Sequence, residues 1–289
     1  MQALRRAALV LSLWAGVAHA PDAHAQNAQV QDGPPLRTGV DGTFAPFAFP
    51  SLLGGVQGFS VDLFTEVARR LHRPITIDST SYSGLIPALD AGRYDFLAAP
   101  TTVTKERAEN LLFASGYMWT AFQFGIKKGT APITSLQDLR GKVITVNKGS
   151  AYDAWATANA ATYGFVSQAY DSQSDAVQAV LAGRAAANLG GNAVIRYAAT
   201  KLPQFQPDFV IKETRAQWAA PFRKDEAALR NQVQDVMSCM KRDGSLAKLS
   251  EKWFGVPPAD DDLERVVDPG YGVPGMPGYD PTPHELNCT

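Results

Sequence analysis

The residues that carry most hydrolytic and metal-dependent chemistry are scarce in this sequence. Its 289 residues include two cysteines and four histidines. His19 and His24 lie close to the N-terminus, and neither His72 nor His284 has a partner at the spacing of a metal site. The motifs G-x-S-x-G and H-E-x-x-H do not occur. The sequence therefore argues against a hydrolase or a metalloenzyme, and we expect no cofactor.

An excess of charge of either sign is also missing. The 27 lysines and arginines nearly balance the 28 aspartates and glutamates, which leaves a formal net charge of −1. Such a balance provides no basic surface for nucleic acid. The hydrophobic content of 45% and the charged content of 19% are ordinary for a globular protein, and the length allows one large domain or two small ones.

Long hydrophobic runs are lacking beyond the N-terminus. Arg5 and Arg6 precede an apolar run of 11 residues at 7–17, which is too short to span a bilayer. Two small-x-small sites follow this run. We expect residues 1–25 to be a signal peptide cleaved after Ala25, so that the mature protein is exported to the periplasm and soluble. The alternative is an uncleaved membrane anchor.

The two cysteines, Cys239 and Cys288, both follow the predicted signal peptide. In an oxidising compartment an even pair predicts a disulfide, and two unpaired thiols are the alternative. Residues 257–289 carry 7 prolines and 4 glycines. We expect this C-terminal segment to form an extended strap without regular structure, closed onto the body of the protein by Cys288.

One stretch combines strand, hydroxyl and guanidinium signals. The apolar segment at 94–99 indicates a buried strand of a parallel sheet. Pro100, Thr101 and Thr102 follow it, and Arg107 lies in the short helix that comes next. Arginine holds a carboxylate with two parallel hydrogen bonds. The stretch therefore predicts a rim that binds a small anion, with a surface arginine in a salt bridge as the alternative.

Alternating strand and helix patterns precede this stretch and predict a parallel α/β sheet. Ligands of such sheets lie beyond the carboxyl ends of the strands, which places Asp41, Phe44 and Tyr82 on the same rim as Arg107. Phe44 is either a core residue or an aromatic platform for a ligand. The patterns lie at 36–40, 58–71, 75–77 and 85–89.

A second series of strands and helices begins near residue 143. A strand at 143–146 is followed by Lys148, Gly149 and Ser150, which open a helix at 152–160. Free N–H groups at such a helix start favour an anion, although most Gly-Ser turns are only helix caps. Two amphipathic helices, at 225–240 and 246–254, close the body of the protein.

The order of these motifs resembles the family 3 extracellular solute-binding proteins, the amino-acid-binding receptors of bacterial ABC importers. The resemblance extends from residue 36 to residue 255, and no single motif within it is decisive. The matching segments are 41–47 (D-G-T-F-A-P-F), 58–63, 84–89 (G-L-I-P-A-L), 92–95, 102–107, 135–141, 148–150, 170–183 and 243–254.

The resemblance implies an α/β fold of the type II periplasmic-binding-protein class, with two lobes joined by two crossovers. Lobe I would comprise residues 36–120 and 218–256, and lobe II residues 121–217. The implied function is a monomeric receptor that captures a small carboxylate, first of all an amino acid, and delivers it to an ABC permease in the inner membrane. It needs no catalytic residue. The alternatives are a non-transport accessory or sensor partner, for example of a dehydrogenase, and a dehydratase of the cyclohexadienyl dehydratase type.

The resemblance also assigns roles to individual residues. The carboxylate anchor falls on Arg107, and the stacking aromatic falls on Phe44 with Tyr82 as a second wall. Asp41 corresponds to an acid near the ligand side chain. The remaining ligand-binding positions are the loop Pro100, Thr101 and Thr102 and the lobe II helix start Ser150 and Ala151.

One position departs from the family pattern. The family usually has an aspartate after a lobe II strand, where it receives the α-ammonium of the ligand. Here the neighbourhood is Gly190, Gly191 and Asn192, and Asn192 accepts a hydrogen bond without offering a charge. Either Asp41 or another acid takes the ammonium, or the ligand is a carboxylate that lacks one.

Overall fold

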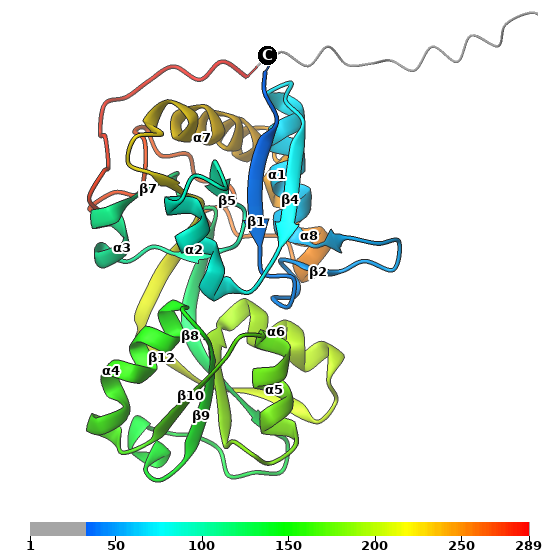
Figure 1. Cartoon of the computed structure of the whole chain (residues 1–289), viewed down its shortest axis with the longest axis vertical. Coiled ribbons are helices and arrows are strands. Elements are labelled where there is room, and N and C mark those ends of the chain that lie inside the picture. Colours follow the sequence, from blue (N-terminus) through cyan, green and yellow to red (C-terminus); the bar gives the residue numbers. More distant parts are fainter. Residues whose placement is uncertain (1–32, 289) are drawn as a thin grey trace, which may run out of the picture. The chain divides into compact units, whose positions relative to one another are not determined.

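The computed structural model describes residues 33–288, so the predicted signal peptide at 1–25 lies outside the described residues. The first sheet has the strand order β4-β1-β5, built from β4 (Ile75–Ser79), β1 (Leu36–Val40) and β5 (Phe96–Leu97) (Figure 1). Both pairings are parallel, as the sequence predicted. We call this sheet and the helices on it lobe I.

The helices of lobe I cover this sheet with apolar faces. In α1 (Phe59–Arg70), Phe59, Leu63 and Val67 recur at helical spacing and are buried, while Arg69 pairs with Glu66 on the outer face. The other helices of this lobe are α2 (Tyr82–Asp90), α3 (Lys105–Asn110), α7 (Ala227–Arg242) and α8 (Ser245–Phe254).

The second sheet has the order β10-β9-β11-β8-β12-β6 and is mixed. β9, β10 and β11 are mutually parallel, whereas β8 and β12 run antiparallel to their neighbours. With its helices this sheet forms lobe II, except for β6 and the end of β12 that pairs with it, which we count with lobe I. Lobe II occupies the lower part of Figure 1. The strands are β8 (Met118–Lys127), β9 (Val143–Asn147), β10 (Val166–Tyr170), β11 (Ala187–Gly191), β12 (Phe205–Ala219) and β6 (Thr101–Thr102). The helices are η1 (Leu136–Leu139), α4 (Ala151–Tyr163), α5 (Gln173–Leu181) and α6 (Asn192–Lys201).

Two long strands carry the chain between the lobes. β8 and β12 pair antiparallel, and Met118 lies opposite Trp218 where they approach lobe I. Trp218 then pairs with Thr102 of β6, so one end of β12 also belongs to the rim of lobe I. The two connections between the lobes, β8 and β12, are therefore neighbouring strands that are hydrogen-bonded to each other.

Several elements differ from the sequence predictions. The strand expected at 94–99 shortens to β5, and β12 is longer than any strand expected from the sequence. Helix α6 and a hairpin of β2 (Phe49–Pro50) and β3 (Val56–Gln57) were not predicted. Helix α6 follows two glycines and buries only Val194 and Ile195, which is too short a pattern to stand out. The short pairs β7 (Leu111–Phe113) and β13 (Pro221–Arg223) complete the strands.

The C-terminal strap, residues 257–288, contains no helix and no named strand among its described residues. An isolated bridge between Tyr271 and Asp280 is its one β contact among the described residues. Cys239 of α7 and Cys288 form a disulfide, which confirms that prediction. The side chain of Gln234 binds the strap twice, because its amide donates to the Gly270 carbonyl at 2.7 Å and its oxygen accepts from the Gly272 N–H at 2.8 Å.

A buried lysine lies under the strap. Lys241 is 3% exposed, and its ammonium donates to the carbonyl of Gly116, just before β8, at 2.8 Å. Burial lowers the pKa of Lys241 to about 8, although the nearby carboxylates of Asp268 and Glu264 act in the opposite direction. Among residues 33–288, no helix has the length and apolarity needed to cross a membrane.

The disulfide is expected to contribute strongly to stability, because it closes a loop of 49 residues in sequence separation. In the chain-entropy description such a loop is worth about 4 kcal/mol. Chemical denaturation with and without dithiothreitol should show this loss in the native protein. A variant with both Cys239→Ser and Cys288→Ser should match the reduced protein and should not respond to the reductant. Equal stability of the oxidised and reduced proteins would contradict the expectation.

Lys241 is expected to make stability rise with pH. The pKa of Lys241 is about 8 in the folded state, which is below its value in the unfolded chain. Between pH 8 and 10 the unfolded chain therefore binds more protons than the folded protein, and raising the pH destabilises the unfolded state relative to the folded one. The free energy of unfolding of the native protein relative to a Lys241→Met variant should increase by about 2 kcal/mol from pH 7.5 to 10. Urea titrations at these two pH values measure the difference, and a pH-independent difference would refute this role.

Candidate functional site

Asp41 lies directly after β1, at the carboxyl end of the lobe I sheet. It is 2% exposed, and one carboxylate oxygen accepts from the Thr43 N–H at 2.9 Å and from the Thr43 hydroxyl at 2.7 Å. The other oxygen accepts from the amide of Asn147, the last residue of β9, at 2.7 Å. Burial raises the pKa of Asp41, while these hydrogen bonds act against the shift. The carboxylate thus connects the two lobes.

Other hydrogen bonds cross between the lobes beside this one. The N–H of Gln173 in α5 donates to the hydroxyl of Thr43 at 3.0 Å. The guanidinium of Arg107 donates to the carbonyl of Gly149 at 3.1 Å. Polar groups from both lobes are therefore in direct contact where the two lobes meet.

Arg107 occupies the position predicted for an anion anchor. Its backbone N–H donates to the hydroxyl of Thr104, which caps α3, and its guanidinium also donates to the Thr102 carbonyl at 3.0 Å. The guanidinium carbon lies 5.8 Å from the centre of the Tyr82 ring. Its hydrogen-bond partners are backbone carbonyls, one from each lobe, rather than the carboxylate of a surface salt bridge.

The aromatic residues of the rim form one cluster around Trp218. Phe44 lies edge-on to Trp218 with 6.3 Å between ring centres, and Phe47 lies 4.7 Å from the same indole. The Trp218 N–H donates to the Thr102 hydroxyl at 3.2 Å, and the Tyr82 hydroxyl donates to the Thr101 hydroxyl at 3.4 Å. Trp218 was not among the residues predicted from the sequence, because no local pattern marks it.

A cavity of about 510 Å³ opens between the lobes beside Arg107. It brings together four of the predicted ligand-binding residues, and Trp155 and Arg215 also line it. Its volume suits a small organic molecule. The predicted residues that line it are Thr102, Arg107, Ser150 and Ala151.

Ser150 is the N-cap of α4. Its hydroxyl accepts from the N–H of Asp153 at 3.2 Å, and the Asp153 carboxylate accepts in turn from the N–H of Gly149 at 2.9 Å. This is the capping arrangement that the sequence offered as the alternative to anion binding. Ser150 nevertheless faces the cavity beside Arg107, so its contact with a ligand stays a prediction.

Asn192 does not join the other predicted residues around this cavity. Its side-chain oxygen accepts from the backbone N–H groups of Ala193 and Ala121, and it lines a separate hollow that also includes Trp119 and Arg196. Gly191 faces the cluster instead. A β-carbon at this position would lie 2.5 Å from the Trp218 ring and 2.6 Å from the Tyr152 hydroxyl, so only glycine fits there.

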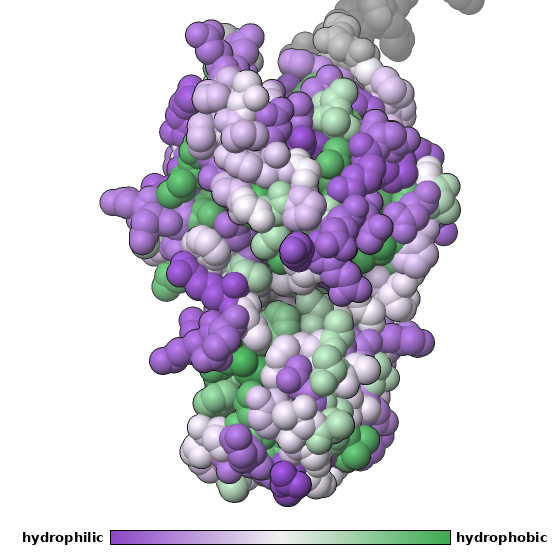
Figure 2. Space-filling view, turned by 90° about the vertical axis from the view of Figure 1, so that its left-hand side faces the viewer, coloured by the Kyte–Doolittle hydropathy of each residue, from purple (hydrophilic) through white to green (hydrophobic). Residues whose placement is uncertain are grey.

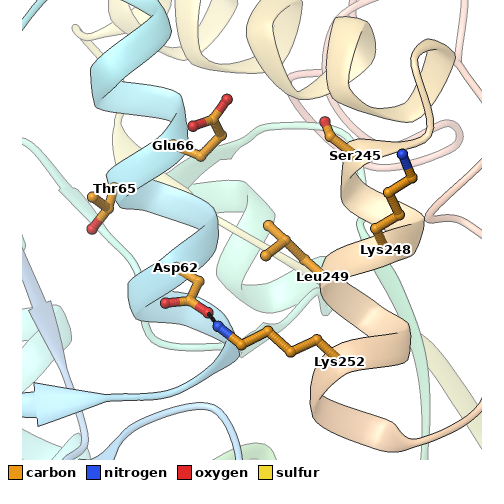
Figure 3. Close-up of a pocket in the computed structure, with 7 residues that line it drawn as sticks. All are labelled: Asp62, Thr65, Glu66, Ser245, Lys248, Leu249 and Lys252. Atoms are coloured by element: carbon orange, nitrogen blue, oxygen red, sulfur yellow. Dashed lines mark hydrogen bonds and ion pairs between the residues drawn. The ribbon is translucent and has the colours of Figure 1, made fainter.

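The surface has a further hollow between α1 and α8. On the face shown in Figure 2, hydrophilic residues predominate on the upper lobe, and less polar residues gather where it meets the lower one. The hollow between α1 and α8 is bordered by Asp62 and Lys252, which form an ion pair at 2.7 Å (Figure 3). None of the predicted ligand-binding residues lines it. Among residues 33–288, no group of three or more histidines, cysteines, aspartates or glutamates is placed to hold a metal ion.

The two-lobed α/β architecture is shared with known proteins. The profile of the bacterial extracellular solute-binding proteins, family 3, matches residues 36–256. The chain belongs to this family. The match covers both sheets and α7 and α8, and it leaves the strap outside the shared region.

Relatives and solved structures agree with this membership. The L-cystine-binding protein TcyJ of Escherichia coli K12 is 30% identical over 232 residues, which is 78% of this chain and 85% of TcyJ. An ancestral arginine-binding protein bound to arginine is 30% identical with a TM-score of 0.71 and covers 76% of this chain and 98% of its own. The ancestral amino acid-binding protein AncCDT-1, a precursor of cyclohexadienyl dehydratase, is 30% identical with a TM-score of 0.70, over 76% of this chain and 95% of its own. The type II periplasmic-binding-protein fold is thereby confirmed.

Replacing Asn147 by aspartate should separate the lobes at neutral pH. The Asn147 amide nitrogen lies 2.7 Å from a carboxylate oxygen of the buried Asp41. Asn147→Asp therefore places a second carboxylate next to this one, and the two like charges repel. Small-angle X-ray scattering should give a larger radius of gyration than for the native protein at pH 7.5. The difference should diminish as the pH is lowered and the pair of carboxylates takes up a proton.

Asn159→Asp is the matched control for this variant. Asn159 lies on α4 and binds the carbonyl of Trp155 within the same helix, so its replacement should leave the radius of gyration unchanged. An Asn147→Asp variant as compact as the native protein at pH 7.5 would show that the contact between Asp41 and Asn147 does not hold the lobes together.

Proposed function

We propose that this chain is a periplasmic receptor that captures a small carboxylate between its lobes and delivers it to an ABC permease of the inner membrane. The main support for this proposal is the position of Arg107. Its guanidinium lines the cavity between the lobes and donates to one backbone carbonyl of each lobe. An arginine in this position can exchange a carbonyl for a carboxylate, a stronger acceptor. Binding would then favour the arrangement in which the lobes are in contact.

Amino acids are the first solute class to test. TcyJ is named as an L-cystine-binding protein, YxeM of Bacillus subtilis as a probable amino-acid-binding protein, and the ancestral structure holds arginine. In this proposal the carboxylate binds Arg107, Thr102, Ser150 and Ala151, while Phe44 and Tyr82 shape the lobe I wall. Asp41, Pro100, Thr101 and Asn192 stay candidates for contacts with the remainder of the solute.

The proposed organisation follows from export and hinge motion. Residues 1–25 would be removed after Ala25, and the receptor would act as a monomer. Lobe I would comprise residues 36–120 and 218–256, and lobe II residues 121–217, with the strap at 257–289. The neighbouring strands β8 and β12 support a hinge at the crossovers.

We propose binding rather than catalysis. The similarity to AncCDT-1 makes a dehydratase the enzymatic alternative, and such an enzyme needs an acid that is free to transfer a proton at the ligand. Asp41 is the buried carboxylate at the meeting of the lobes, and its two oxygens already accept three hydrogen bonds. Formation of product from prephenate or arogenate would overturn this part of the proposal.

Arg107→Ala should weaken binding of the solute by about a hundredfold, because two hydrogen bonds to a carboxylate would be lost. Titration calorimetry with a solute found by thermal-shift screening measures the effect. The exposed Arg140→Ala serves as a control for the loss of a positive charge, and circular dichroism checks that both variants fold. Native affinity in Arg107→Ala would disprove the anchor role.

A further inference from the structure

The hairpin of β2 and β3 ends in two adjacent leucines that lie open to solvent. Leu52 is completely exposed and Leu53 is 98% exposed, whereas the next most exposed large apolar side chain among residues 33–288 is that of Val256, at 66%. In Figure 1 the hairpin projects sideways from lobe I, beyond α1 and α8. A single exposed leucine is ordinary on a protein surface, but two together at the tip of a projecting hairpin form an apolar contact point.

Hydrogen bonds within the turn hold the two leucines in place. The Ser51 N–H donates to the Gly55 carbonyl at 3.0 Å, and the Gly54 N–H donates to the Ser51 carbonyl at 3.1 Å. The Leu53 N–H donates to the Ser51 hydroxyl at 3.2 Å. Gly54 and Gly55 have φ angles of +92° and +69°, which suit glycine, and a β-carbon at either would meet nothing within 4 Å. The leucines are therefore presented by a closed turn that stands free of the rest of the protein.

The sequence around this tip carries no charge. Residues 43–61 include no aspartate, glutamate, lysine or arginine, although these residues make up 19% of the chain. Moving a charged side chain out of water is costly unless it finds a partner. The tip of the hairpin can therefore enter an apolar medium without the cost of desolvating a charge.

Aromatic and basic side chains surround the base of the hairpin. The ring of Phe49 lies edge-on to that of Trp253 in α8, with 5.8 Å between the ring centres. The ammonium of Lys252 lies 5.1 Å from the centre of the Trp253 ring and pairs with Asp62. Lys248 lies one turn earlier on the same helix (Figure 3). Tryptophan and lysine are the residues that proteins place at the headgroup layer of a membrane, beside an apolar part that goes deeper.

We propose that the hairpin of β2 and β3 is a reversible membrane contact, which inserts Leu52 and Leu53 into the surface of a phospholipid bilayer. Trp253 and the lysines of α8 then lie at the level of the headgroups, where lysine attracts phosphate. Two leucine side chains contain fewer carbon atoms than one myristoyl chain, which itself binds membranes only marginally. The contact is therefore weak and leaves the protein free to dissociate.

Two other partners fit the tip less well. A second copy of this chain would need roughly 800 Å² of surface from each partner for a stable dimer, of which two leucine side chains supply only a small part. A protein partner is ordinarily oriented by a polar rim and by complementary charges around the apolar contact. The hairpin offers no charge for this purpose, whereas a bilayer requires none.

Sedimentation with phospholipid vesicles tests the proposal. The protein used begins after Ala25, because the apolar run at 7–17 would itself bind lipid, and residues 31–289 form one compact unit. The native protein should sediment with neutral phosphatidylcholine vesicles at millimolar lipid. Leu52→Ser combined with Leu53→Ser should lower the partition coefficient at least tenfold, since it removes both apolar side chains from the tip.

Val166→Ser combined with Val266→Ser is the matched control. Both valines are exposed, at 59% and 39%, and neither belongs to the hairpin, so this variant should bind vesicles as the native protein does. Because Leu52 and Leu53 are exposed, their replacement should leave the midpoint of thermal unfolding unchanged. A loss of binding in the leucine variant is then a property of the tip.

Three results would overturn the proposal. They are the absence of binding to neutral vesicles, equal binding of the native protein and the leucine variant, and binding only to vesicles that contain phosphatidylglycerol. The last of these, if it disappears at high salt, would indicate adsorption through charge instead of insertion. The absence of binding to any vesicle would indicate a protein pocket as the partner of the tip.

A fluorescent label reports directly whether the tip enters the lipid. The two cysteines of the chain form a disulfide, so Leu53→Cys provides a single thiol for an environment-sensitive nitrobenzoxadiazole label. Its emission should rise and move to shorter wavelength when vesicles are added. The same label at Val166→Cys, on β10 of lobe II, should not respond. An unresponsive label at residue 53 would contradict insertion even if the protein sediments with the vesicles.

Discussion

The relative position of the two lobes depends on the backbone pairing of β12 with β8 on one side and with β6 on the other. Through these pairs a single strand end contributes to the crossover and to the rim that carries Thr101 and Thr102. Trp218 occupies this junction, and its indole packs on Phe44 and Phe47 and binds Thr102. Any rotation of the lobes about the crossovers must therefore act on the geometry of the rim as well.

Local sequence patterns predicted the elements that are specified locally. The strand at 36–40 was found as expected, helix α1 agrees within one residue at each end, and the hydroxyl–arginine rim after β5 has the predicted composition. Thr104 caps α3 through a hydrogen bond to the backbone of Arg107, three residues later, and so fixes the backbone position of Arg107. Such short-range relations can be read from a sequence.

Relations between distant residues could not be read in the same way. Asn147 lies 106 positions from Asp41 and looks like an ordinary strand end, and Trp218 lies 116 positions from Thr102. Nothing local shows that Gly191 is needed because an indole and a tyrosine hydroxyl approach it. The turn into α6 directs Asn192 to another hollow than the cavity beside Arg107, so its role in ligand binding stays a prediction. The resemblance indicated where a site is expected, and the contacts among these distant residues are known only from the fold.

The adjacency of β8 and β12 has a consequence for how the molecule assembles. Lobe II is an insertion between two neighbouring points of lobe I, and α7, α8 and the strap, which complete lobe I, are synthesised after it. Lobe II contains nearly all its own contacts in one continuous segment, so it can acquire its fold while lobe I still lacks its final helices. Lobe I is then completed only when α7 and α8 have followed, and the disulfide between Cys239 and Cys288 joins two segments that both come after lobe II in the chain.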